Sequence, residues 1–289
     1  TKYGKYVLYL IMTDQAKYIW FNGKIVPWED AQIHVMSHVL HYGSGVFEGI
    51  KCYDSDKGPA IFRLDSHIKR LYESAKIYSM EIPFSKEEII KGCIDIVNKN
   101  ALPECYIRPI VFYGYDTLGV NPKNCPVNVA IAAFFWGAYL GEAGLKKGVN
   151  ICITPWEKIS YKAIPSIAKA SGQYMNSMLA VKYARRKGYD EGLLLDSRGY
   201  VAEGSGQNIF IVKSGVVYTN DEKSSILLHT GEYEEKGEYW SDSLSFMQSD
   251  SKSWIYNYLS SLGFLTVSII GEFPTHLNNH NRTLFCCNK

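Results

Sequence analysis

Two apolar runs in the first half of the chain, YIRPIVFYG (106–114) and VNVAIAAFFW (127–136), constrain its fold most strongly. Both are rich in β-branched and aromatic residues, and each predicts a core strand. Two helices are predicted before them. The segment 65–78 has apolar residues three and four positions apart, and the segment 85–100 begins with the capping-box sequence SKEE. The first half of the chain is therefore expected to combine strands with helices.

The glycine-rich stretch 138–148 predicts a connector between two domains. Residues 1–11 are interpreted as an extra N-terminal segment, and residues 12–137 as a small N-terminal domain. Residues 149–220 are expected to form the core of a larger C-terminal domain. Residues 221–289 are rich in serine and lack local consistency, so they are interpreted as a divergent tail. The other predicted elements are hairpins around Asn22-Gly23 and Ser214-Gly215, strands at 149–156 and 191–197, and a helix at 174–188.

The composition argues against several classes of partner. Lysine and arginine total 31 and aspartate and glutamate total 29, so the net charge is +2. This balance gives no electrostatic basis for binding nucleic acid or a membrane surface, and no apolar run is long enough to span a bilayer. The 7 cysteines are scattered and lack C-x-x-C spacing, which favours a reduced, cytoplasmic protein without structural zinc.

The segment PSIAKASGQYMNSMLA (165–180) places one lysine, Lys169, among small residues, which indicates close packing against its backbone. A lysine that attacks a carbonyl must lose its proton, and burial promotes that loss. The common carbonyl partner is pyridoxal phosphate, which carries an aldehyde, a phosphate, a phenolic oxygen and a ring nitrogen. Candidate partners are Tyr174 for the phenolic oxygen, Glu203 for the ring nitrogen and Arg70 for the phosphate. On spacing alone, a solvated lysine with a core tyrosine and surface charges stays an open alternative.

Two further motifs favour structural roles over functional ones. The glycine-rich turn AEGSGQN (202–208) could present N–H groups to an anion, but it leads into a strand and is a weak signal. His34, His38 and His41 have a spacing that would place them on one face of a helix, where they could hold a metal. No glutamate lies between them to act as a general base, so histidines hydrogen-bonded within a packed segment are the favoured interpretation.

Arg108 lies within an apolar strand, where a charge is rarely tolerated without a partner. A substrate carboxylate is one possible partner, and an internal aspartate or glutamate is the other. Aromatic residues that could belong to the same cluster are Tyr42, Tyr106, Trp136 and Tyr139.

Together these residues resemble a known family. The sequence YIWFNGKIVPWEDAQIHVMSHVLHYGSGVFEGIKCYDSDKGPAIFRLDSHIKRL (18–71) is similar to the amino-terminal part of branched-chain amino-acid aminotransferases, which are class IV, fold-type IV pyridoxal phosphate enzymes. The resemblance continues through AYLG, PSIAKASGQYMNSMLA and GYDEGLLLDSRGYVAEGSGQNIF, and it covers roughly residues 12–220. It implies an α+β fold with a small N-terminal α/β domain and a larger C-terminal domain, and it implies a homo-oligomer, a dimer or higher.

The resemblance also implies the activity and the roles of individual residues. The reaction would transfer an amino group between leucine, isoleucine or valine and 2-oxoglutarate. Lys169 would be the Schiff-base lysine and proton shuttle, with Glu203, Tyr174 and Arg70 on the pyridine nitrogen, the phenolic oxygen and the phosphate. The interdomain loop that closes over the substrate would be LGVNP (118–122). Substrate-binding residues would be Tyr42, Phe47, Gly49, Tyr106, Arg108, Trp136 and Tyr139.

The resemblance stops near Leu228. The family continues with a Gly-Ile-Thr-Arg segment that opens a phosphate-binding helix and later has a Gly-Thr-Ala segment, and the sequence contains neither. We therefore interpret the tail as divergent or frameshifted, which leaves a catalytically inactive product as one alternative. The others are a D-amino-acid aminotransferase, an aminodeoxychorismate lyase and a metal hydrolase that uses the three histidines.

Overall fold

A computed structural model of the chain describes residues 16–137, 148–213, 216–219, 226–227, 264–268 and 283–288. The chain divides into two compact units, of which the first contains residues 1–136 with Ala168–Gly172 and the second contains residues 137–167 with 173–289. The segment around Lys169 thus belongs to the first unit, although the sequence on both sides of it belongs to the second. Most of the predicted connector, residues 138–147, lies outside the described residues.

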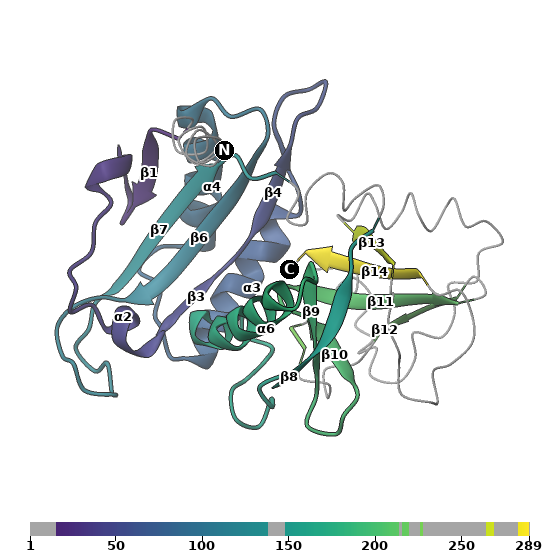
Figure 1. The fold of residues 1–289 in the computed structure, drawn as a ribbon. Coiled ribbons are helices and arrows are strands. Elements are labelled where there is room, and N and C mark those ends of the chain that lie inside the picture. The colour runs from purple at the N-terminus through teal and green to yellow at the C-terminus, as the bar shows by residue number, and fades with distance from the viewer. Residues whose placement is uncertain are drawn as a thin grey trace, which may run out of the picture. The chain divides into compact units, whose positions relative to one another are not determined.

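The first unit is built on a seven-stranded sheet with the order β2-β1-β7-β6-β4-β5, in which β3 also pairs with β6 (Figure 1). All of its strand pairs are antiparallel. The two apolar runs predicted as core strands form β6 and β7, which confirms that prediction. The strands are β1 (Tyr18–Phe21), β2 (Lys24–Pro27), β3 (Gly45–Phe47), β4 (Ile50–Tyr53), β5 (Ala60–Ile61), β6 (Cys105–Tyr113) and β7 (Val127–Phe134).

The hairpin predicted at Asn22-Gly23 is also confirmed, since these two residues connect β1 to β2. Both have positive φ angles, 47° for Asn22 and 87° for Gly23. A two-residue hairpin turn of this hand requires positive φ at both positions, and asparagine followed by glycine meets that requirement at the lowest cost.

Helices α3 (Leu64–Ile77) and α4 (Lys86–Asn100) pack against the sheet and against each other. Their apolar faces, which include Ile68, Leu71 and Ile89, form one hydrophobic core with the strands. The predicted capping box at the start of α4 is present, and it supplies partners for two backbone N–H groups that the helix cannot satisfy itself. The short elements of this unit are η1 (Trp28–Asp30) and α2 (His38–Tyr42).

The second unit contains a three-stranded sheet with the order β10-β9-β8 and a four-stranded sheet with the order β12-β11-β14-β13 (Figure 1). Strands β8 and β9 are parallel, and helix α6, which connects them along the chain, packs on both. The elements are β8 (Ile151–Glu157), η2 (Ser171–Gln173), which begins in the first unit, α6 (Tyr174–Arg186), β9 (Glu191–Leu195), β10 (Val201–Gly204), β11 (Gln207–Lys213), β12 (Val216–Thr219), β13 (Phe264–Ser268) and β14 (Thr283–Asn288).

The tail contributes more regular structure than the sequence predicted. In the tail, the sequence favours a helix and a strand only within residues 251–270, and β13 lies there. No element was expected at 283–288, yet β14 forms there and pairs with both β11 and β13. Within the described residues no helix is long and apolar enough to cross a membrane. Mixed helices and mainly antiparallel strands agree with the predicted α+β class.

Candidate active site

Lys169 is buried in the first unit, with only 1% of its surface exposed. Its backbone is fixed on both sides, since its N–H donates to Ser74 Oγ at 3.0 Å and its carbonyl accepts from the N–H of Phe47 at 3.0 Å. Its Nζ atom lies 5.3 Å from the centre of the Phe47 ring. In general, burial disfavours the charged form of an amine because that form loses its contact with water. The face of an aromatic ring acts in the other direction, because it attracts a cation.

The small residues around Lys169 have a physical explanation in this packing. A Cβ atom on Gly43 would lie 2.9 Å from the Cα of Gly172, and one on Gly45 would lie 3.1 Å from Ser171 Oγ. Ala170 forms a bridge with Val46 of β3. The segment around Lys169 thus packs closely against the backbone at the end of α2 and in β3.

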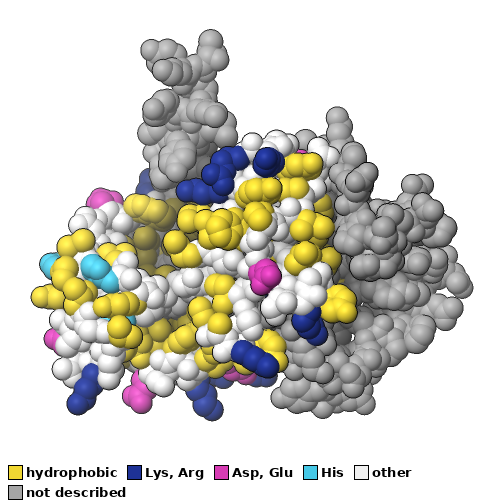
Figure 2. Space-filling view, turned by 60° about the horizontal axis from the view of Figure 1, so that its bottom comes forward, with side chains coloured by type: hydrophobic (Ala, Val, Ile, Leu, Met, Phe, Trp, Pro, Cys, Tyr) yellow, Lys and Arg dark blue, Asp and Glu magenta, His cyan; other side chains and the backbone are white. Residues whose placement is uncertain are grey.

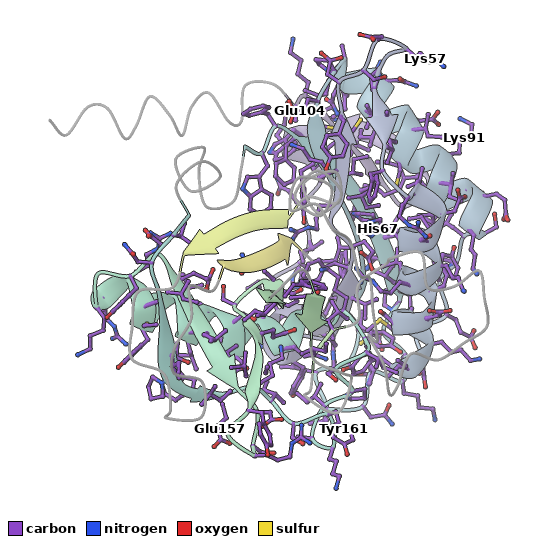
Figure 3. All side chains as sticks on the ribbon, turned by 90° about the vertical axis from the view of Figure 1, so that its right-hand side faces the viewer. Lys57, His67, Lys91, Glu104, Glu157 and Tyr161 are labelled. Carbon is purple, nitrogen blue, oxygen red and sulfur yellow. The ribbon has the colours of Figure 1, made fainter. Side chains whose placement is uncertain are left out.

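Arg70 and His67 lie on α3, which carries the labelled His67 in Figure 3, and both face a buried carboxylate, Glu48. Arg70 Nε and Nη2 donate to Glu48 Oε1 and Oε2 at 2.6 and 2.7 Å. His67 Nδ1 lies 2.8 Å from Glu48 Oε2. Glu48 itself is completely buried. Arg70 was predicted as a site residue from the sequence, whereas Glu48 and His67 were not.

The protonation states of this cluster follow from its geometry. Burial acts to raise the pKa of Glu48, but the charge and hydrogen bonds of Arg70, together with those of His67, hold that pKa well below its usual range. Burial lowers the pKa of His67, and the hydrogen bond to Glu48 only partly opposes this shift. Glu48 is thus a carboxylate and His67 a neutral imidazole at pH 7. Because an ionised carboxylate only accepts hydrogen bonds, the proton of His67 is assigned to Nδ1.

Arg108 on β6 is surrounded by aromatic rings. Its guanidinium carbon lies 4.7 Å from the ring centre of Phe47, 5.2 Å from that of Tyr106 and 5.7 Å from that of Trp136. Its Nη2 donates to Tyr106 Oη at 3.4 Å, and its buried Nε has no hydrogen-bond partner among the described residues. No aspartate or glutamate in the described part of the chain forms an ion pair with it.

Gly49 lies against the hydroxyl end of the Tyr106 side chain. A Cβ atom on Gly49 would be 1.7 Å from Tyr106 Oη and 2.6 Å from its Cζ, so Gly49→Ala must displace the ring. We expect this variant to lose at least about 1 kcal/mol of unfolding free energy through overpacking and to lower amino-transfer activity. Chemical denaturation and steady-state kinetics check both expectations.

Two variants serve as controls for that prediction. Gly137→Ala places its Cβ where no atom lies within 4 Å and should unfold like the parent. In a double-mutant cycle, Tyr106→Leu should relieve the stability loss of Gly49→Ala, because the clashing ring is removed. Equal stability losses for Gly49→Ala with and without the ring would contradict the clash as the cause.

The other two aromatic residues predicted to bind substrate are Tyr42 and Tyr139. Tyr42 is 44% exposed, and its hydroxyl donates to the carbonyl of Leu118, in the predicted substrate loop, at 2.7 Å. Tyr139 lies outside the described residues. Within the first unit, Phe47, Tyr106, Trp136 and Arg108 therefore form one cluster, whereas Tyr42 lies with the loop.

The three histidines do not share a helical face, so that geometric expectation was wrong. Helix α2 begins at His38, after an extended residue at Ser37, and His34 precedes it. His38 is buried, with Nδ1 2.7 Å from Ser44 Oγ and Nε2 2.9 Å from the Gly119 carbonyl. His34 and His41 are exposed, and Figure 2 shows histidine side chains at the surface among hydrophobic ones. The part of the chain that the structure describes contains no group of three or more histidine, cysteine, aspartate or glutamate residues placed to hold a metal.

Glu203 on β10 is the buried carboxylate of the second unit, with 0% of its surface exposed. Lys158 Nζ lies 2.6 Å from Glu203 Oε1, and the N–H of Leu227 donates to Oε2 at 3.3 Å. Lys158, which is also buried, was not singled out in the sequence, where it reads as an ordinary charge after a strand. Tyr174 is the first residue of α6 and is half-buried.

The N–H groups of the glycine-rich turn after Glu203 donate to side chains of the second unit. The N–H of Ser205 donates to Glu191 Oε1 at 3.4 Å, and that of Gly206 donates to Gln207 Oε1 at 3.4 Å. Burial raises the pKa of Glu191, against the hydrogen bonds that Ser205, Gly192 and Gln207 donate to it. These internal partners support the structural interpretation of the turn.

Comparisons with known proteins place these features in a family. Residues 45–229 match the family described as Amino-transferase class IV. The branched-chain-amino-acid aminotransferase of Escherichia coli (strain K12) is 50% identical over 216 residues, which cover 74% of this chain and 70% of that protein. The enzyme of the same name from Pseudomonas aeruginosa is 47% identical over 208 residues, covering 72% and 68%.

Solved structures give the same result. A crystal structure of the Escherichia coli branched-chain amino acid aminotransferase has a TM-score of 0.73 at 43% identity, covering 89% of this chain and 77% of that one. A T.th. branched-chain amino acid aminotransferase complexed with N-(5'-phosphopyridoxyl)-L-glutamate has a TM-score of 0.69 at 48% identity, covering 73% and 69%. The chain therefore belongs to the class IV aminotransferases. The relatives and solved structures named above are branched-chain-amino-acid aminotransferases, as the sequence resemblance predicted.

The first unit, taken by itself, contains a buried amine, Lys169, and a guanidinium, Arg70, whose chemistry suits the aldehyde and the phosphate of a phosphopyridoxyl group of the kind present in that relative. The second unit, taken by itself, contains a buried carboxylate, Glu203, which pairs with Lys158.

Proposed function

We propose that this chain is a pyridoxal 5′-phosphate-dependent transaminase that exchanges the amino group between leucine, isoleucine or valine and 2-oxoglutarate. The observation that carries the proposal is the buried amine of Lys169, fixed at its backbone and packed beside the Phe47 ring. The close relatives at 50% and 47% identity support the branched-chain substrate class.

Each residue would have a distinct task in that reaction. The bound cofactor supplies an electron-withdrawing ring that stabilises negative charge at the substrate Cα. The Lys169 amine would take and return the proton at the substrate Cα. The Glu203 carboxylate would accept a hydrogen bond from the protonated ring nitrogen. Arg70 would hold the phosphate, and Tyr174 would donate to the phenolic oxygen.

The cluster around Arg108 suits an amino acid with an aliphatic side chain. The walls formed by Phe47 and Trp136, with Tyr42 and Tyr139 as further contributors, provide apolar contact without requiring charge. One methylene is worth only about 1–3 kcal/mol in such a pocket, so all three branched-chain amino acids should react. Arg108 and Tyr106 would bind a substrate carboxylate, and Gly49 leaves room for the Tyr106 ring.

We also propose a homo-oligomer, a dimer or higher, located in the cytoplasm. Large apolar side chains on α2, on the segment before it and on the loop that Tyr42 contacts are exposed: Val35, Leu40, Leu118 and Val120. Exposed apolar side chains favour association where they gather in one patch. Five cysteines are free thiols, which is the expected state in a reducing compartment: Cys52, Cys93, Cys105, Cys125 and Cys152.

The direct test is amino transfer by the purified chain with added pyridoxal phosphate. The three branched-chain L-amino acids should react with 2-oxoglutarate, whereas D-alanine and aminodeoxychorismate should not. Turnover of either of the latter in preference to L-leucine would favour the alternative enzymes of this fold. A protein that binds the cofactor but transfers no amino group from any of these donors would contradict the proposal.

Arg108→Met is expected to lower kcat/KM for leucine and glutamate by about 10–100-fold. Loss of a hydrogen bond to a charged group costs about 1.5–3 kcal/mol, and the substrate carboxylate would lose that bond. Arg185→Met is the matched control, because Arg185 is an exposed residue of α6 paired with Asp190 at 3.5 Å, and it should react like the parent. Unchanged kinetics in Arg108→Met would remove Arg108 from the substrate site.

A further inference from the structure

Cys52 and Cys105 lie opposite each other on two neighbouring strands of the first unit, and the proposed transamination gives them no task. Strands β4 and β6 are antiparallel and lie side by side in Figure 1, and their register pairs Cys52 directly with Cys105. Both side chains are completely buried, both thiols are free, and the two side chains are hydrogen-bonded to each other. Glu104, the residue before Cys105, marks this place in Figure 3. Among the described strand pairs, no other brings two cysteines into register.

The register places the two Cα atoms within disulfide range. Residues directly opposite each other in an antiparallel pair have Cα atoms about 4.5 or 5.5 Å apart, depending on whether the pair exchanges backbone hydrogen bonds. A disulfide spans about 4.4–6.8 Å between Cα atoms. Both kinds of pair lie within that range, so an S–S bond can join Cys52 to Cys105 without sliding β4 along β6. Cys125, in contrast, donates its S–H to the carbonyl of Thr117 at 3.4 Å.

The surroundings of the two thiols distinguish their roles. Burial raises the pKa of Cys105 to about 12, and its hydrogen bond to Cys52 adds to this rise. Burial also raises the pKa of Cys52, but the hydrogen bond from Cys105 and the positive charge of Lys51 oppose that rise. The thiolate is the nucleophilic form of cysteine, and a donated hydrogen bond stabilises it. Cys52 is therefore the attacking sulfur, and Cys105 is the sulfur that reacts second.

A buried pair reacts only with an oxidant that can enter the sheet, and the pair lies close to a sheet edge. The outer neighbour of β4 is β5, the last strand in the order of the sheet, which has only two residues, Ala60 and Ile61. Ile61 pairs with Cys52 itself. Opening an edge of a sheet locally costs less free energy than unfolding the whole domain, and a hydroperoxide as small as hydrogen peroxide can enter through such an opening.

We propose that Cys52 and Cys105 form a modification site, at which a hydroperoxide oxidises the pair to a cross-strand disulfide that fits the native strands and that a thiol reductant reverses. The Cys52 thiolate attacks the peroxide, the O–O bond breaks, and a sulfenic acid forms on Cys52. The hydroxide released takes up the Cys52 proton and leaves as water. The Cys105 sulfur then displaces the hydroxyl group from Cys52, which leaves as a second water with the Cys105 proton. The two thiols together lose two electrons, and the peroxide gains them.

Reversal follows the chemistry of thiol–disulfide exchange, in which two thiols of the reductant are oxidised while both cysteines are reduced. The inference does not rest on the proposed function, because the bond forms within the first unit and its detection requires neither cofactor nor substrate.

The test is peptide mapping of the full chain after treatment with hydrogen peroxide. Remaining thiols are alkylated under denaturing conditions, and the protein is digested with trypsin and measured by mass spectrometry. The peptide 52–57 should be found joined to the peptide 100–123 with the loss of two hydrogens, and the joined species should disappear after dithiothreitol. Cys93→Ala, which removes another buried thiol of the same unit, is the control and should retain the joined species. Cys52→Ala and Cys105→Ala should lose it.

The single variants also test the order of the two steps. In Cys105→Ala the reaction should stop at the sulfenic acid on Cys52, which dimedone traps, whereas Cys52→Ala should give little dimedone adduct on Cys105. Cys52→Val and Cys105→Val cover the case in which the alanine variants do not fold. Oxidation of the parent should raise the midpoint of thermal unfolding by about 5 °C or more, because the bond closes a long loop of the chain.

Three results would overturn the proposal. The first is recovery of Cys52 and Cys105 as unlinked thiols at a peroxide dose that oxidises Cys152, which is partly exposed. The second is a disulfide that joins either residue to a different cysteine of the chain. The third is a lower unfolding midpoint in the oxidised parent, which would show that the bond distorts β4 and β6.

Discussion

Lys169→Ala should lower the rate of amino transfer by about 10³-fold or more. A positioned base contributes about 10²–10⁴-fold to proton transfer, and Lys169 would also form the covalent link to the cofactor. The amine lies beside the Phe47 ring with 1% of its surface exposed, so no solvent base can easily take its place.

Two measurements distinguish loss of chemistry from loss of structure in this variant. After borohydride reduction of the loaded parent, peptide mapping should find the pyridoxyl group on Lys169, and the variant should carry none. A small primary amine added to Lys169→Ala should restore part of the activity, which a misfolded protein would not show. Lys162→Ala, at an exposed position of the second unit, is the control. Activity within tenfold of the parent in Lys169→Ala would exclude Lys169 as the catalytic amine.

Lys158→Met is expected to destabilise the protein more than any of the other substitutions. Lys158 and Glu203 are both buried, with Nζ and Oε1 2.6 Å apart. Removing one partner of a buried ion pair costs about 3–5 kcal/mol, because the other charge then stays in a medium of low polarity. Urea denaturation followed by circular dichroism measures this loss in unfolding free energy.

Two companion variants test the reason for that loss. Lys158→Arg keeps the charge and should lose much less stability than Lys158→Met. The double variant Lys158→Met with Glu203→Gln should regain part of the lost stability, because the buried charge is removed along with its partner. A loss below about 1 kcal/mol in Lys158→Met, the range of exposed pairs, would show that this pair contributes like a surface contact.

Local signals in the sequence predicted most elements of the fold. The Asn22-Gly23 turn and the capping box of α4 are decided by residues within four positions of each other, so short-range chemistry is sufficient to find them. The same reasoning failed for the three histidines. Their spacing fits a helix, but Ser37 is extended and Gly43, with a φ of 63°, ends α2 after five residues.

The buried ion pairs could not be predicted in the same way. Glu48 and Arg70 are 22 positions apart, and Glu203 and Lys158 lie on separate segments of the second unit. A charged residue in a sequence is most often at the surface, and only tertiary packing shows which charges are enclosed together. The resemblance to a family pointed to Arg70 and Glu203 but not to the partners that hold them. Strand β14 was missed for a similar reason, since its pairing with β11 depends on residues distant in the chain.

The five residues from Ala168 to Gly172 belong to the first unit, although they are translated after β8 of the second. Ala170 is part of the hydrophobic core of the first unit, so a fragment cut after Trp136 would lack both this contact and the buried Lys169 amine. The two units therefore cannot be separated at one point in the gene. On the ribosome, the first unit can complete its packing only after the beginning of the second has been synthesised.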